Sequence, residues 1–114
     1  MRSVVFAAPF PLETTMRFAR AAARLPNVKL LGVVQEPPKG KDRRLFADVV
    51  RVTDGLSARD LIDAIDVLRS RHGHPHRIIG VLEPLQVQLA LARAHFGVPG
   101  TDPDTADLFR DKAR

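Results

Sequence analysis

Two turns of this 114-residue chain carry residues that could contact a substrate. The first contains Pro9, Phe10 and Glu13, and the hydroxyl groups of Thr14 and Thr15 follow at the start of an expected helix. Free backbone N–H groups at a helix start, together with such hydroxyls, can receive a carboxylate or a phosphate. In proteins such hydroxyls more often cap the helix. The alternative hypothesis is that they bind a substrate.

The second turn contains Glu83, which directly follows an apolar segment and precedes a further expected helix. A glutamate at the end of a central strand is suited to contacting a substrate or a partner domain. The alternative is an acidic residue that stands at a helix start because the helix dipole favours it there. Both interpretations remain open from the sequence.

Three alternating histidines, His72, His74 and His76, could in principle converge on a metal ion. No carboxylate or cysteine accompanies them in the sequence, and Pro75 restricts how their side chains converge. We therefore predict no metal site and interpret the three as solvent-exposed loop residues.

Four apolar segments and the helical patterns between them are expected to position these turns. The expected strands cover residues 3–8, 29–34, 48–52 and 77–82, and the expected helices cover residues 13–25, 57–72 and 85–96. Such alternation implies a parallel sheet with helices on both faces. The expected fold class is α/β, a three-layer Rossmann-like open sheet of about four strands in the order 3-2-1-4. In that order the 9–13 and 83–85 turns face each other across a ligand crevice.

The first expected helix has an apolar and a basic stripe. Its buried face is predicted from the spacing i, i+4, i+7 of Phe18, Ala22 and Leu25. The opposite face carries Arg17, Arg20 and Arg24. The second helix is expected to begin at Ser57 with a capping-box-like arrangement and to bury Leu61, Ile65 and Leu68.

The formal net charge of +5 comes from the first fifty residues. Residues 1–50 hold nine basic and four acidic residues, whereas residues 51–114 hold nine of each. The excess lies on Arg17, Arg20, Arg24, Lys39, Lys41, Arg43 and Arg44. Because the chain has no Trp or Tyr on which bases can stack, we expect a solvated basic face and no nucleic-acid partner.

Composition and missing motifs exclude several functions. The absence of cysteine excludes disulfide scaffolds and thiol nucleophiles and is compatible with the cytoplasm, where we expect the protein. No apolar run approaches the roughly 20 residues of a membrane span, so no membrane partner is expected. The first turn contains no glycine, which argues against a dinucleotide site, and neither a P-loop nor a G-x-S-x-G motif occurs.

From residue 78 onward the chain resembles the region of ATP-grasp ligases that precedes their ATP-binding domain. That region consists of an apolar strand ending in a glutamate, a helix, a glycine turn and a helix ending in an Asp-Lys pair. The corresponding features here are Glu83, the turn FGVPG at residues 96–100, and the pair Asp111-Lys112. The preceding segment from Asp48 to Leu68 also looks like the N-terminal domain of this family.

The resemblance implies a domain of an enzyme that activates a carboxylate as an acyl-phosphate with ATP and Mg²⁺, for attack by an amine or similar nucleophile. It implies that Lys112 contacts the ATP phosphates and that Glu83 faces the substrate or the domain boundary. The substrate-side crevice is then expected to contain Pro9, Phe10, Glu13, Thr14, Thr15 and Glu83.

Residues 1–101 are expected to form this domain, and residues 102–114 to begin a linker helix towards an absent C-terminal ATP-grasp domain. No Gly or Asn terminates that helix, so the chain is expected to be a fragment, inactive and cofactor-free by itself. Its expected partners are the absent domain, docked on an exposed apolar patch, and a small carboxylate; a homodimer is left open. The alternative is a stand-alone flavodoxin-like binding or adaptor module without catalysis.

Overall fold

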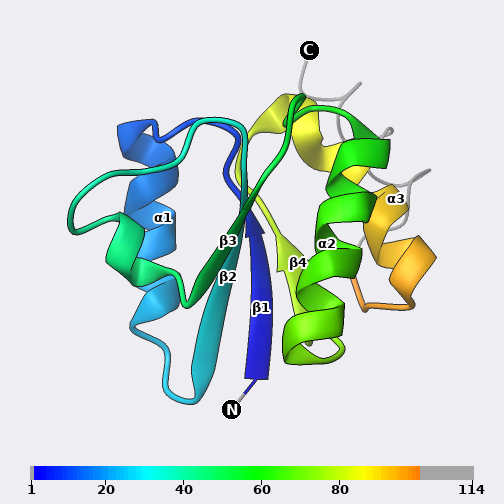
Figure 1. Cartoon of the computed structure of the whole chain (residues 1–114), viewed down its shortest axis with the longest axis horizontal. Coiled ribbons are helices and arrows are strands. Elements are labelled where there is room, and N and C mark those ends of the chain that lie inside the picture. The colour runs from blue at the N-terminus through cyan, green and yellow to red at the C-terminus, as the bar shows by residue number, and fades with distance from the viewer. Residues whose placement is uncertain (1, 101–114) are drawn as a thin grey trace.

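The computed structural model describes residues 2–100, which form a four-stranded sheet and three main helices (Figure 1). The strands are β1 (Arg2–Ala7), β2 (Val28–Val34), β3 (Asp48–Arg51) and β4 (Arg77–Ile79). The helices are α1 (Glu13–Ala23), α2 (Ala58–His72) and α3 (Gln86–Phe96), with short 3₁₀ turns η1 (Arg43–Leu45) and η2 (Glu83–Leu85). The expected linker helix, its boundary at residue 101 and Lys112 lie outside the described residues.

All strand pairs are parallel, and the order across the sheet is β3-β2-β1-β4, as the sequence predicts. In the middle of the sheet, Val5 of β1 lies opposite Leu31 of β2 and Ile78 of β4. The α/β fold class with a Rossmann-like open sheet is thereby confirmed.

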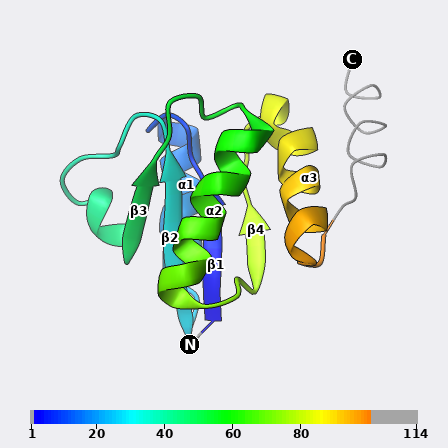
Figure 2. The same ribbon diagram turned by 45° about the vertical axis from the view of Figure 1, so that its right-hand side comes forward.

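The two faces of the sheet carry two separate apolar cores. Val5 and Ala7 of β1 face the core that contains the buried residues of α2 and α3. Val4 and Phe6 face the core beneath α1. Figure 2 shows α2 in front of the sheet, α1 behind it and α3 beside β4. Because α2 and α3 share one core, they form one layer, which gives the predicted three layers.

Helix α2 follows the prediction closely. The Ser57 hydroxyl accepts the backbone N–H of Asp60 at 3.2 Å and caps the helix, which satisfies a donor that the first turn would leave free. Leu61, Ile65 and Leu68 are all buried against the sheet. The helix ends at Gly73, whose positive φ of 86° suits a residue without a Cβ.

The predicted face of α1 is wrong. Phe18 and Leu25 are 53% and 57% exposed, and the helix instead buries Thr15, Met16 and Ala19. The volume beneath α1 is already occupied by Phe6 and by Phe46 from the loop after η1, with ring centroids 6.4 Å apart. The helix therefore packs on the sheet through the small Ala19 and the flexible Met16, and the ring of Phe18 points to solvent.

Strand β4 ends at Ile79, three residues earlier than expected. The Gln86 side-chain amide donates to the carbonyls of Gly80 at 3.3 Å and Leu82 at 2.9 Å. These two carbonyls therefore accept hydrogen bonds within the turn that leads into α3, and they do not extend the pairing of β4 in the sheet. Helix α3 lies within the expected range of residues 85–96, buries Leu89 and Ala92, and ends with Gly97 as a left-handed C-cap at φ 66°.

Large apolar side chains are exposed on both faces of the described part of the chain. The six large apolar side chains that are exposed divide between the two faces of the molecule. Leu12, Phe18 and Leu25 accompany α1, whereas Leu56, Val67 and Leu91 accompany α2 and α3.

The corrected face of α1 is testable by a pair of substitutions. Met16→Ala removes a side chain that is 1% exposed, so it should lower the free energy of unfolding by about 2–5 kcal/mol. Phe18→Ala on the same helix should change it by less than about 1 kcal/mol, because that ring is largely in solvent. Urea unfolding followed by circular dichroism measures both, and the reverse ranking would contradict the assigned face.

Candidate functional site

The carboxyl ends of the strands meet at one edge of the sheet, where connections from both faces converge. The chain leaves β1 towards α1 on one face and leaves β4 towards α3 on the other. The order of the strands therefore reverses between β1 and β4, and ligands of open α/β sheets bind at such a point. The Pro9–Glu13 turn and η2 both belong to this edge.

Gln35, which directly follows β2, holds this edge together. Its backbone N–H donates to the Pro9 carbonyl at 3.0 Å, and its side-chain oxygen accepts the Gly55 N–H at 2.9 Å. Its own carbonyl accepts Nε of Arg51 at 3.2 Å. One residue thus joins the ends of β1, β2 and β3 to the loop before α2.

The start of α1 carries no side-chain cap. The N-cap position is Leu12, so the interpretation of Thr14 or Thr15 as the cap is not supported. Thr14 is exposed, whereas Thr15 is 1% exposed and its hydroxyl has no hydrogen-bond partner among the described residues. Of the two predicted hydroxyls, only that of Thr14 lies at the surface, beside backbone N–H groups of the first turn.

Glu13, in the same turn, is exposed and paired. Its carboxylate accepts Nη1 of Arg20 at 2.9 Å, and this bond lowers the pKa of Glu13 below its usual value. The arginine offsets a negative charge that would otherwise repel an anion at the helix start.

Glu83 is exposed at the start of η2, and its carboxylate makes no ion pair or hydrogen bond with any described residue. The neighbouring backbone is fixed by the two Gln86 bonds described above and by the Leu85 N–H, which donates to the Leu82 carbonyl at 3.1 Å. Among the described residues Glu83 is therefore an unpaired carboxylate on a turn whose backbone is fixed by hydrogen bonds.

One concave part of this edge lies beside the predicted crevice. An open depression of about 640 Å³ is lined by Phe10, Gln35, Glu36, Arg51, Val52 and Thr53. Of the predicted crevice residues only Phe10 lines it; Pro9 is buried beneath the loop, and Glu83 lies towards β4. Sequence reasoning missed Gln35, Arg51 and Thr53, although their positions at the ends of β2 and β3 are the signal that finds them.

The opposite edge of the sheet carries a polar cluster centred on His72. Nε2 of His72 lies 2.9 Å from Oδ2 of Asp48, and Nδ1 lies 3.1 Å from Nζ of Lys29. Arg71 adds a second pairing to Asp48 at 3.2 Å. The bond from His72, followed by that from Arg71, lowers the pKa of the Asp48 carboxyl.

His72 is therefore not the exposed loop residue that the sequence suggested, because its side chain is only 19% exposed. His74 is exposed, and His76 lies 3.5 Å from Nη1 of Arg2, with its pKa lowered by burial and by Arg77 and Arg2. Within residues 2–100, no three His, Cys, Asp or Glu side chains are grouped to hold a metal ion. No described helix is both long and apolar enough to cross a membrane.

Comparison with known proteins reveals a structural likeness and no sequence match. No protein-family model and no curated protein matches the chain. Among solved structures, the L-amino acid ligase from Bacillus licheniformis is similar, with a TM-score of 0.73 and 13% identity over 94% of this chain. The match covers 26% of the ligase, so this chain spans about a quarter of that protein's length. At this identity the likeness establishes the shared fold.

The close packing at the carboxyl edge predicts that any side chain at position 55, where the chain has Gly55, destabilises the fold. A Cβ added there would lie 2.6 Å from Cβ of Pro9. We expect Gly55→Ala to lower the free energy of unfolding by about 1–3 kcal/mol, because the loop must move away from Pro9. Thr53→Ala, two residues away and exposed, should change it by less than about 0.5 kcal/mol. Equal stabilities of the two variants in thermal unfolding would contradict this packing.

The Asp48 cluster predicts a pH-dependent contribution to stability. A carboxyl whose folded pKa lies below its usual value of 3.8 stabilises the fold above that pH, and the contribution is lost as the pH falls towards the lowered pKa. Asp48→Asn should therefore be clearly less stable than the wild type at pH 6, and the difference should shrink towards pH 2. Asp63→Asn is the control, because Asp63 pairs with no side chain in residues 2–100. A gap that stays constant with pH for Asp48→Asn would refute the role of this carboxylate.

Proposed function

We propose that this chain is the N-terminal, substrate-side domain of an ATP-grasp ligase. The enzyme would activate a carboxylate as an acyl-phosphate with ATP, and an amine or similar nucleophile would then displace the phosphate. The observation that carries the proposal is the likeness of fold to an L-amino acid ligase over 94% of this chain. The resemblance of residues 78–114 to the same class of ligases supports it independently.

The carboxyl edge of the sheet has the features that a carboxylate substrate requires. Arg51 lines the depression, and only its Nε is used by Gln35, so the guanidinium retains donors for a bidentate pairing. The uncapped N–H groups at the start of α1, near Phe10, favour an anion as well. The unpaired carboxylate of Glu83 suits an approaching amine or the face of a second domain.

ATP and Mg²⁺ belong mainly to the proposed second domain. Within residues 2–100 no three metal-ligating side chains are grouped, and we assign the ligands of the ion to the second domain as part of the proposal. Lys112 would contact the ATP phosphates from the linker helix, where its charge offsets theirs. The 114-residue chain alone is accordingly expected to have no ligase activity, and the complete enzyme to work in the cytoplasm.

The proposal is tested on the complete protein encoded by the reading frame that contains this domain. Incubated with ATP, Mg²⁺ and pairs of L-amino acids, it should release phosphate only when a carboxylate and an amine are both present. Failure to release phosphate with any pair, or a reading frame that ends at codon 114, would contradict the proposal.

A substitution in the complete enzyme distinguishes an effect on carboxylate binding from an effect on ATP binding. Arg51→Gln should raise the KM for the carboxylate about tenfold or more, because one charge-assisted pairing is lost. The KM for ATP should change little, since the nucleotide is assigned to the other domain. Arg59→Gln on the exposed side of α2 is the matched control and should leave both values unchanged. An equal rise in both KM values for Arg51→Gln would argue against a carboxylate site at this edge.

A further inference from the structure

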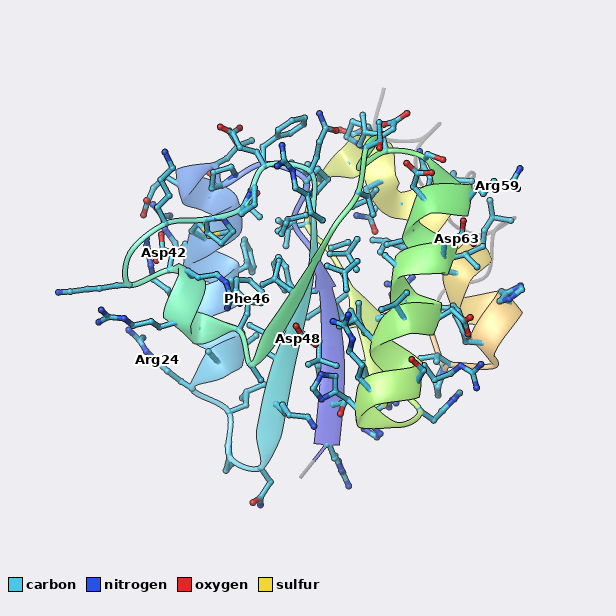
Figure 3. All side chains as sticks on the ribbon, viewed as in Figure 1. Arg24, Asp42, Phe46, Asp48, Arg59 and Asp63 are labelled. Atoms are coloured by element: carbon cyan, nitrogen blue, oxygen red, sulfur yellow. The ribbon has the colours of Figure 1, made fainter. Side chains whose placement is uncertain are left out.

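Two basic segments that are separate in the sequence come together on the α1 side of the molecule. Helix α1 contributes Arg20, its C-cap is Arg24, and the loop between β2 and η1 contributes Lys39 and Lys41. Together they line an open depression of about 610 Å³. Figure 3 shows Arg24, which follows α1, and Asp42, the N-cap of η1, on this side of the molecule.

Asp42 fixes the two segments to each other. Its carboxylate accepts both Nε and Nη2 of Arg20, each at 3.0 Å, in a bidentate pairing. Nη1 of Arg20 is taken by Glu13 at 2.9 Å. Arg20 is thereby neutralised and acts as the structural link, and its pKa is raised above the usual value by the bonds to Asp42 and Glu13.

The remaining cations of the depression are not neutralised. Arg24, Lys39 and Lys41 are exposed, and their side chains make no hydrogen bond or ion pair with the residues that the structure describes. Three like charges around one concavity repel one another, and the only carboxylate in the lining is committed to Arg20. An anion with several charges would remove this repulsion.

The shape of the depression favours a small ligand over a nucleic acid. Its volume lies in the range of small-molecule sites, and its lining includes the apolar side chains of Ala23 and Leu45. Single-stranded nucleic acid is held by aromatic rings on which bases stack. The nearby Phe46 is only 4% exposed, and Phe18, although exposed, does not line the depression.

We propose that this depression is a binding site for the oligophosphate group of a small molecule. Two or more linked phosphates match the three free cations in charge, whereas a single carboxylate does not. The site is separate from the carboxyl edge of the sheet, with which it shares no lining residue, and it does not depend on the proposed ligase activity.

The probe is inorganic tripolyphosphate, titrated into the 114-residue chain at low ionic strength and followed by calorimetry. Arg24→Gln combined with Lys41→Gln should weaken binding about tenfold or more. Arg59→Gln combined with Arg77→Gln removes the same net charge at exposed positions outside the depression and should change binding less than twofold. Orthophosphate should bind the wild-type chain about tenfold more weakly than tripolyphosphate.

Each outcome decides for or against the site. Loss of affinity confined to the Arg24/Lys41 variant, with unchanged thermal unfolding, supports it. Equal loss in both variants would mean that only the net charge attracts the anion, and would overturn the proposal. Absence of tripolyphosphate binding would overturn it as well, as would tighter binding of single-stranded RNA at the same salt concentration. Amide NMR shifts on titration should centre on Ala23, Lys41 and Leu45, and shifts centred elsewhere would contradict the location.

Discussion

The architecture depends on the burial of β1 from both sides. Val5 and Ala7 pack in one core and Val4 and Phe6 in the other, so both faces of the strand are buried. A strand of this kind is stable only when helices pack on both faces of its sheet. This requirement sends α1 to the face opposite α2 and α3, and it makes connections from the two faces meet beyond the carboxyl end of β1. The crevice edge is thus a consequence of how the core is filled.

The same edge is held together by hydrogen bonds between side chains and backbone groups of different elements. Gln35 ties the Pro9 carbonyl, the Gly55 amide and Arg51 to one position, and Gln86 does the equivalent at the other turn. Since one fold serves many activities, the likeness to a ligase acquires functional meaning only through these residues at the edge.

The sequence was sufficient for the topology because strand and helix periodicity, caps and right-handed crossovers all agree. Ser57, Gly73 and Gly97 end or begin helices through their own backbone and side-chain chemistry, which is local. The face of α1 was not predictable in the same way. Phe18 and Met16 both suit an amphipathic helix, and the choice depends on Phe46, a residue from a distant loop that occupies the space below. The bonds of His72 to Asp48 and Lys29 also join residues far apart in the chain.

The two depressions on the described part of the chain differ in the charged residues that line them. The excess of cations in the first fifty residues suggested a solvated basic face. In the structure Asp42 binds Arg20 and so holds the loop against α1, and several of these cations line one depression. At the carboxyl edge the balance differs, because Arg51 lines a depression that also contains Glu36. A site with one cation and one carboxylate suits a ligand that carries both charges, as an amino acid does. A site with several free cations suits a multiply charged anion. If both proposals hold, the two depressions, which share no lining residue, would select ligands by the number and sign of their charges.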